Sequence, residues 1–150
     1  MTVALLDVNL LIALAWPNHV HHDTALGWFK RNQVGGWATC PVTQSGFVRV
    51  SSNARVMPEA RSPAEALLLL RRITGLPGHR FWADDISLPV TQLIDPSKLQ
   101  GYRQVTDAHL LALALRYRGR LATLDDGIPG LVPSGYDPAN TVCVLTQDPS

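Results

Sequence analysis

The sequence is poor in cysteine and contains no long apolar run. Cys40 and Cys143 form no CxxC motif and are too few for a disulfide framework, which indicates a reduced setting. No window reaches ~18 uninterrupted apolar residues. The N-terminal segment has no basic residue before its apolar stretch, and Asp7 and Asn9 interrupt that stretch. We therefore expect a cytoplasmic protein with neither a signal peptide nor a membrane span.

Charged residues are also scarce. They make up 17% of the 150 residues, whereas 46% are hydrophobic. This composition excludes a disordered chain, and the length suits a single domain over residues 1–150. Glycine and proline number 11 each and are scattered, which excludes collagen-like and low-complexity structure.

The positive charge is concentrated in the middle of the chain. Residues 49–122 carry eleven Lys or Arg against six Asp or Glu, whereas residues 123–150 carry four Asp and no base. Lysine is rare, since eleven of the thirteen basic residues are arginine. Arginine suits bidentate phosphate contacts. The charge pattern permits a polyanionic partner, but it does not by itself indicate one.

Short apolar segments alternate with segments of helical periodicity. The apolar segments predict strands over residues 3–7, 37–40, 80–83, 120–124 and 141–145. The helical segments are residues 9–15, 18–34, 43–51, 62–73 and 106–119, with Thr43, Ser62 and Thr106 as expected N-caps. Residues 84–104 are mostly loop, with one helical turn near 97–101. This alternation predicts βαβ units and a parallel sheet.

Three carboxylates fall at one predicted edge of that sheet. Asp7 ends the first strand, Asp125 ends the fourth, and Asp107 lies in the first turn of the helix before the fourth. Ligands of parallel α/β sheets bind beyond the carboxyl ends of the strands. Crowded carboxylates raise one another's pKa unless a cation lies among them, and Mg²⁺ or Mn²⁺ prefers such oxygen ligands. Each Asp also has a local interpretation, as a helix-terminal charge or a turn residue.

Four segments resemble the PIN-domain ribonucleases, and more closely the VapC-type toxins of bacterial toxin–antitoxin pairs. They are Leu6-Asp7-Val8-Asn9-Leu10-Leu11, Thr43-Gln44-Ser45-Gly46-Phe47-Val48-Arg49-Val50, Thr106-Asp107-Ala108 and Ala122-Thr123-Leu124-Asp125. Each motif alone is weak, but they occur in the family's order and span most of the chain. The resemblance implies a three-layer α/β/α sandwich around a mostly parallel sheet of four to five strands.

The resemblance also implies a function. It implies a Mg²⁺- or Mn²⁺-dependent endoribonuclease that cleaves single-stranded or looped RNA, forms a homodimer and is neutralised by a cognate antitoxin. By motif match, Asp7, Asp107 and Asp125 become the catalytic metal ligands. Polar residues that orient these carboxylates fall at Asn9, Thr106 and Thr123.

The chain departs from the family pattern at Gln44, where the family usually has Glu. An amide oxygen can ligate a metal or its water but adds no negative charge, so a second metal would bind more weakly. Asp126, Asp84 or Asp85 can supply the missing charge. Arg49 and Arg103 flank the motifs and are candidates for binding RNA phosphate.

Other functions remain open at this point. An RNA-binding PIN-like domain with impaired cleavage is one, because of Gln44. A haloacid-dehalogenase-like phosphatase also begins with a strand that ends in Asp, but it needs a second Asp where this chain has Asn9, and a downstream Lys. Only Lys30 and Lys98 exist, and neither lies near a suitable motif. A phospho-acceptor receiver domain needs an acidic pair near the first strand and a Lys near the last, and both are absent. We expect Trp16, followed by Pro17, to be exposed for a partner contact.

Overall fold

Five short strands form one parallel sheet. The computed structural model describes residues 2–147. The strands are β1 (Ala4–Leu6), β2 (Trp37–Thr39), β3 (His79–Phe81), β4 (Arg120–Thr123) and β5 (Val142–Val144), in the order β3-β2-β1-β4-β5. Every neighbouring pair is parallel. From β1 the chain proceeds outward to β2 and β3, then returns to β4 on the other side. The switch point therefore lies between β1 and β4, where this topology opens a ligand crevice.

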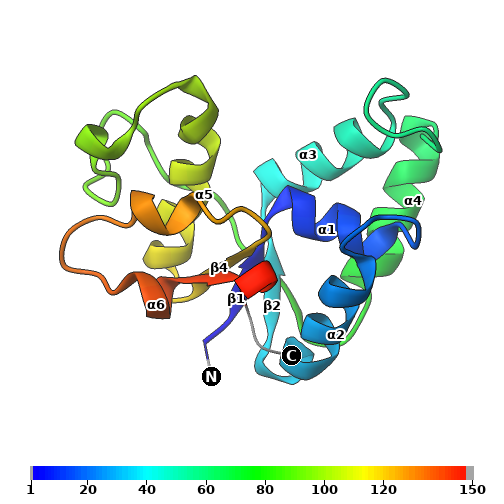
Figure 1. The fold of residues 1–150 in the computed structure, drawn as a ribbon, viewed down its shortest axis with the longest axis horizontal. Helices are drawn as coiled ribbons and strands as arrows, with labels where there is room; N and C mark the ends of the chain where they lie inside the picture. The colour runs from blue at the N-terminus through cyan, green and yellow to red at the C-terminus, as the bar shows by residue number, and fades with distance from the viewer. Residues whose placement is uncertain (1, 148–150) are drawn as a thin grey trace.

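Helices cover both faces of the sheet, as Figure 1 shows. One face carries α1 (Val8–Ala15), α2 (His22–Asn32), α3 (Pro41–Ser51) and α4 (Pro63–Thr74). The other carries α5 (Val105–Arg116) and the short α6 (Pro138–Thr141). Short 3₁₀ turns lie at Gln33–Gly35, Pro96–Lys98, Tyr102–Gln104, Ile128–Leu131 and Leu145–Gln147. The predicted three-layer α/β/α architecture is confirmed.

The strands are buried on both faces, which explains their continuous apolar sequences. Along β1, Leu6 joins a core with Leu10, Trp28 and Phe47 from the α1–α4 layer. Leu5 points the other way and joins a second core around α5. Successive strand residues alternate between faces, so a three-residue strand feeds both cores.

A glycine allows α3 to lie close against α1. A Cβ placed on Gly46 would come within 2.7 Å of the Val8 Cγ2 atom. Any larger residue would push the two helices apart. Because Val8 directly follows Asp7, this contact holds the N-terminal half of α3 near the carboxyl end of β1.

Several predicted boundaries are wrong for local reasons. Thr43 is not an N-cap, because α3 begins at Pro41 and Thr43 Oγ1 instead accepts the Cys40 N–H, 2.9 Å away. Thr106 is not one either, because the turn before it leads directly into α5, which has no side-chain cap. The helix predicted from residue 18 begins at His22.

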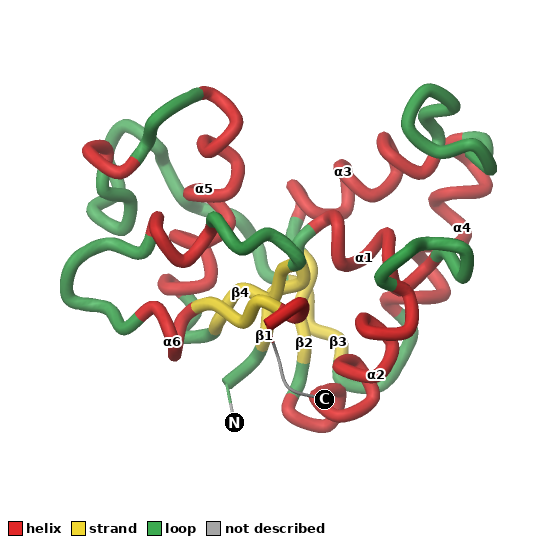
Figure 2. Tube along the Cα trace, viewed as in Figure 1, coloured by secondary structure: helices red, strands yellow, loops and turns green. Residues whose placement is uncertain are grey.

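Two further expectations can be compared with the structure. Trp16 is buried, with 6% exposure, because it packs among the residues of the first core. The expectation that it is an exposed partner contact is therefore wrong. Residues 84–104 are mostly loop, as predicted and as Figure 2 shows. Within residues 2–147, no helix has the length and apolar character needed to span a bilayer.

Candidate active site

The three predicted aspartates lie at the carboxyl edge of the sheet, around its switch point. Asp7 follows β1 and is the N-cap of α1, and its N–H donates to the Ala122 carbonyl of β4 at 2.9 Å. Asp125 lies two residues after the end of β4, and Asp107 lies in the first turn of α5. Because β1 and β4 are neighbours in register, the segments that follow them emerge side by side.

Thr123 connects two of these aspartates. Asp7 is 6% exposed, and its Oδ2 accepts the Thr123 hydroxyl at 2.7 Å while its Oδ1 accepts the Val8 N–H at 2.8 Å. The same Thr123 oxygen accepts the Asp125 N–H at 3.0 Å. This hydroxyl therefore fixes the Asp7 carboxylate relative to the Asp125 backbone.

The carboxylates repel one another. Burial raises the pKa of Asp7, although the bonds from Thr123 and Val8 oppose this, and the Asp125 charge adds to the rise. Burial also raises the pKa of Asp107 to about 6, and the charges of Asp7 and Asp125 contribute. Acids whose ionised forms are destabilised by burial and by neighbouring carboxylates, as those of Asp7 and Asp107 are, make an arrangement that a cation relieves.

The donor chemistry of this edge fits a hard divalent cation, since all three groups are carboxylates. Within residues 2–147, no three His, Cys, Asp or Glu side chains are grouped closely enough to hold an ion together. The Asp125 carboxylate is exposed and accepts the Gly127 N–H at 2.8 Å. This hydrogen bond uses Oδ1 alone, so Oδ2 remains available as a ligand atom.

Asn9 and Thr106 take no part in the hydrogen bonds of the carboxylates within the described residues. Both are exposed, and neither makes a side-chain hydrogen bond within the described residues. Of the three polar residues expected to orient the aspartates, only Thr123 is brought to a carboxylate.

Gln44 is held in a small polar network. Its Nε2 donates to Thr39 Oγ1 at 3.0 Å, and that oxygen lies 2.7 Å from His79 Nε2. Thr39 is fully buried at the end of β2, and burial lowers the pKa of His79. With its amide nitrogen occupied, Gln44 retains its carbonyl oxygen for another donor or a metal ligand. Sequence reasoning missed Thr39 and His79, although a polar residue that ends an apolar strand is a usable signal for Thr39.

Asp84 and Asp85 bind α5 instead of the aspartate cluster. Asp84 Oδ2 lies 2.7 Å from His109 Nε2. Asp85 receives two bonds from Arg116, at 2.9 Å from Nε and 2.5 Å from Nη2, which lower the pKa of Asp85. His109 and Arg116 are two turns apart on one side of α5, so both acids fasten the segment after β3 to that helix.

Asp126 and two arginines have no charged partner within the described residues. Asp126 is exposed, and within the described residues its side chain has no hydrogen bond or ion pair. Arg49 and Arg103 are also exposed, and neither pairs with a carboxylate in the described part of the chain. Lys98 donates to the Val132 carbonyl, which removes it as the lysine that a phosphatase would need.

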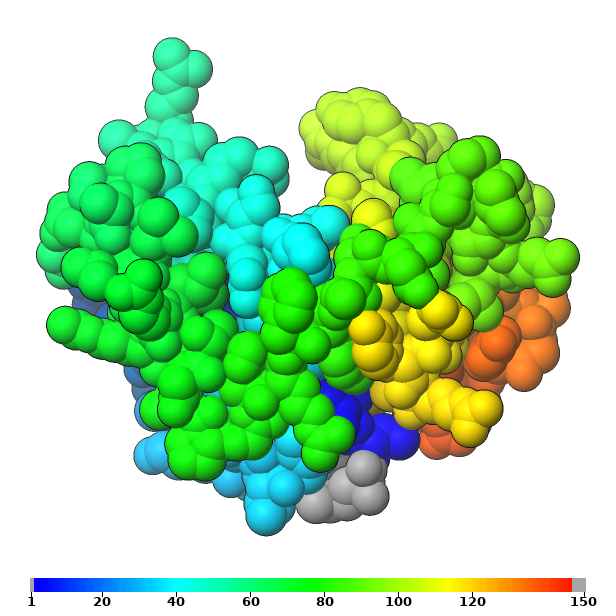
Figure 3. Space-filling model, turned by 180° about the vertical axis from the view of Figure 1, so that it is seen from behind, coloured from blue at the N-terminus to red at the C-terminus, as the bar shows by residue number. Residues whose placement is uncertain are grey.

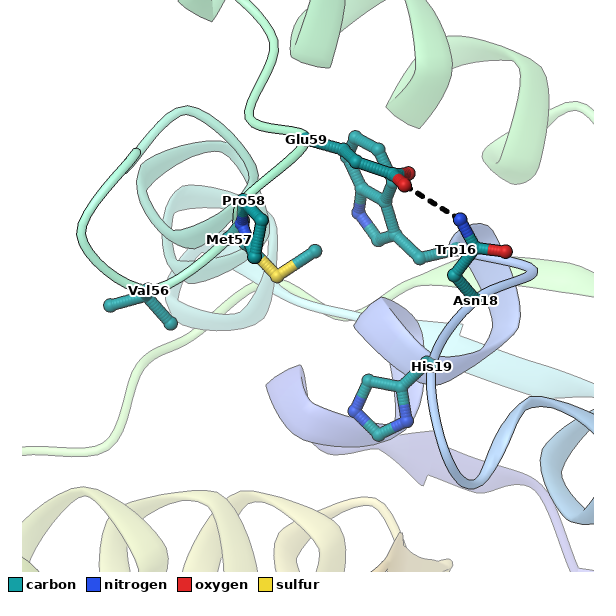
Figure 4. Close-up of a pocket in the computed structure, with 7 residues that line it drawn as sticks. All are labelled: Trp16, Asn18, His19, Val56, Met57, Pro58 and Glu59. Atoms are coloured by element: carbon teal, nitrogen blue, oxygen red, sulfur yellow. Dashed lines mark hydrogen bonds between the residues drawn. The ribbon is translucent and has the colours of Figure 1, made fainter.

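The surface is hollowed beside this edge. Figure 3 shows a recess between the cyan segment around residues 40–50 and the yellow-green segment around residues 100–110, which carry the starts of α3 and α5. A separate pocket of about 270 Å³, drawn in Figure 4, is lined by Trp16, His19, Met57 and neighbouring residues. None of the three aspartates lines that pocket, so it is distinct from the candidate active site.

Comparison with known proteins gives a consistent picture. The PIN domain family matches residues 4–131, which include all three aspartates. Ribonuclease VapC39 of Mycobacterium tuberculosis is 50% identical over 132 residues, which cover 88% of this chain and 95% of the relative. Ribonuclease VapC38 of the same species is 52% identical over 126 residues, covering 84% and 87% of the two chains. Ribonuclease VapC44 is 46% identical over 125 residues, covering 83% and 87%. The chain belongs to the PIN-domain family, among the VapC-type ribonuclease toxins.

Proposed function

We propose that this protein is a Mg²⁺- or Mn²⁺-dependent endoribonuclease that cleaves single-stranded or looped RNA in the cytoplasm. The observation that carries the proposal is the meeting of Asp7, Asp107 and Asp125 at the switch point of the sheet, where burial and neighbouring negative charge raise the pKa of Asp7 and Asp107. These carboxylates would hold the metal, with Thr123 fixing Asp7. A bound divalent ion supplies hydroxide from water and polarises a phosphoryl oxygen.

Other residues of the chain would bind and position the RNA. Arg49 and Arg103 are exposed cations without a carboxylate partner in the described residues, which suits phosphate binding. Gln44 would orient a metal-bound water through its carbonyl oxygen, because Thr39 occupies its amide nitrogen. Asp126 is the remaining acid that can add negative charge near Asp125. Asn9 and Thr106 remain candidates to orient the carboxylates, through side-chain hydrogen bonds that would form when metal binds.

We further propose that a cognate antitoxin neutralises the enzyme and that the enzyme forms a homodimer. The relatives are VapC-type toxins, a class paired with antitoxins. The helix α4 offers apolar surface, since its Leu67 and Leu68 are 54% and 53% exposed, whereas Trp28 and Phe29 of α2 are buried in the core. Exposed leucines of this kind suit a partner helix or strand laid across the helix.

Cleavage of total RNA tests the proposed activity. Wild-type protein should yield discrete fragments with Mg²⁺ or Mn²⁺ and none with EDTA, and Asp7→Asn should remove the activity. Gln44→Glu should increase cleavage at low metal concentration, because it adds a negative charge. If no variant cuts while wild-type protein is still retained on RNA filters, the alternative of a PIN-like domain that binds RNA without cleaving it replaces this proposal. That alternative is favoured specifically by Gln44.

A further inference from the structure

An exposed aromatic and cationic pair stands one turn before Asp107. Tyr102 is 80% exposed and opens the 3₁₀ turn Tyr102–Gln104. Gln104 and Val105 both have right-handed helical backbone angles, so this turn continues directly into α5. Arg103 and Asp107 are therefore four residues apart along a continuous helical segment and lie on one side of it. Five residues of rise place Tyr102 roughly 8–10 Å from Asp107 along the axis.

The tyrosine ring and the guanidinium hold each other in place. The Arg103 Cζ lies 5.7 Å from the centre of the Tyr102 ring, and Arg103 Nε donates to the Tyr102 hydroxyl at 3.3 Å. No carboxylate within residues 2–147 pairs with Arg103. Arg103 can cover only one face of the ring, so the high exposure of Tyr102 leaves the other face open to solvent. The pair therefore presents a flat apolar surface beside a free positive charge.

We propose that Tyr102 stacks on a base of the RNA strand adjacent to the cleaved phosphate, while Arg103 binds a neighbouring phosphate. The inference rests on the proposed function, because it places this RNA contact beside Asp107. Proteins that bind single-stranded RNA combine aromatic rings, which stack on bases, with cations that follow the backbone. The segment around residues 100–110, which carries the pair and leads into α5, borders the recess seen in Figure 3. Stacking also predicts a preference for purines, which offer a larger ring surface.

Two RNA probes of equal length separate base stacking from phosphate binding. The first is a fluorescein-labelled 12-mer of adenosine, and the second is a 12-mer ribose-phosphate chain without bases. Affinity is measured by fluorescence anisotropy in EDTA with the full-length protein, so that no cleavage occurs. The variants are Tyr102→Ala, Tyr102→Phe and Arg103→Ala. Tyr136→Ala is the matched control, because Tyr136 is an exposed tyrosine, at 43%, outside this segment.

The expected result is specific to the bases. Tyr102→Ala should weaken binding of the adenosine 12-mer about 5-fold or more and leave the chain without bases unchanged. Tyr102→Phe should keep the wild-type affinity, whereas Arg103→Ala should weaken the binding of both probes. Tyr136→Ala should change neither. Since Tyr102 is exposed, the melting temperature of each variant should match that of wild type.

Three results would overturn the inference. In the first, Tyr102→Ala binds the adenosine 12-mer as tightly as wild type, which would indicate that Tyr102 contacts a protein and not RNA. In the second, the substitution weakens the binding of both probes equally, which would exclude a role for the base. In the third, wild-type protein binds neither probe. Failure of the proposed nuclease activity is read separately, as an absence of Mg²⁺-dependent cleavage alongside intact base-dependent binding.

Discussion

Removing the charge of Asp107 should stabilise the protein at neutral pH when no divalent metal is present. The pKa of this carboxyl is raised from 3.8 to about 6, by burial first and by the charges of Asp7 and Asp125 next. The folded state therefore holds the Asp107 proton more tightly than the unfolded state. Stability is lost as the pH rises from about 4 to 6, and the loss is complete above pH 6.

The magnitude follows from that shift. A pKa raised by roughly two units corresponds to about 3 kcal/mol for a fully buried group. Asp107 is only half-buried, so solvent screening reduces the cost to roughly 1–2 kcal/mol. Asp107→Asn also loses a favourable charge in the first turn of α5, about 0.5 kcal/mol. The net gain is about 1 kcal/mol, or roughly 2–4 °C in Tm for a chain of this size.

Thermal melting of the two proteins tests this reasoning. At pH 7.5 in EDTA, Asp107→Asn should melt above wild type, and at pH 4 the difference should shrink toward zero. Millimolar Mg²⁺ should raise the Tm of wild type and raise that of the variant less. Asp23→Asn, at an exposed site in the first turn of α2, serves as the control and should gain nothing. A variant that is no more stable than wild type at pH 7.5 would refute the claim that burial and neighbouring charge destabilise the ionised Asp107 carboxylate.

Three other substitutions have defined outcomes. Thr123→Val removes one hydrogen bond to the buried Asp7 carboxylate, so chemical denaturation should show a loss of about 1–3 kcal/mol, and Thr123→Ser should recover most of it. Gly46→Ala should cost about 1–3 kcal/mol by the same measurement, because its Cβ meets Val8; adding Val8→Ala should relieve that part of the cost. Ser62→Ala should cost about 1 kcal/mol in Tm-derived stability, because the Ser62 hydroxyl accepts the Glu65 N–H at 3.2 Å. Equal stability of the respective variant and wild type would contradict each of these expectations.

The sequence was sufficient to predict the sheet and its acidic edge. Strands buried on both faces read as continuous apolar runs, so β1 and β4 were recognisable, and the aspartates that follow them fell at one edge by topology. Chain order alone does not set the strand order. The resemblance to PIN domains supplied the layers, and the structure supplied the central place of β1.

The missed features depend on contacts between distant segments. Asp84 and Asp85 were candidates to supply the missing negative charge of the active site. The structure pairs them with His109 and Arg116 on α5, and the sequence does not reveal that these residues lie opposite them. The contact between Gln44 and Thr39 likewise joins a helix to the end of a strand.

The prediction that Thr106 caps a helix failed for a local reason. The 3₁₀ turn at Tyr102–Gln104 begins the helical path three residues before α5, which places Thr106 inside it. The preference for Thr at helix N-caps gives no information about a 3₁₀ turn that precedes the helix.

The most direct test of the account is the binding of Mn²⁺ to the apo-protein, followed by electron paramagnetic resonance. Wild-type protein should bind Mn²⁺, and the affinity should fall by tenfold or more in Asp107→Asn and in Asp125→Asn, with Asp23→Asn unchanged. That pattern would establish that the edge carboxylates hold the metal. Mn²⁺ affinity that is the same in wild type and in both site variants would contradict the central claim.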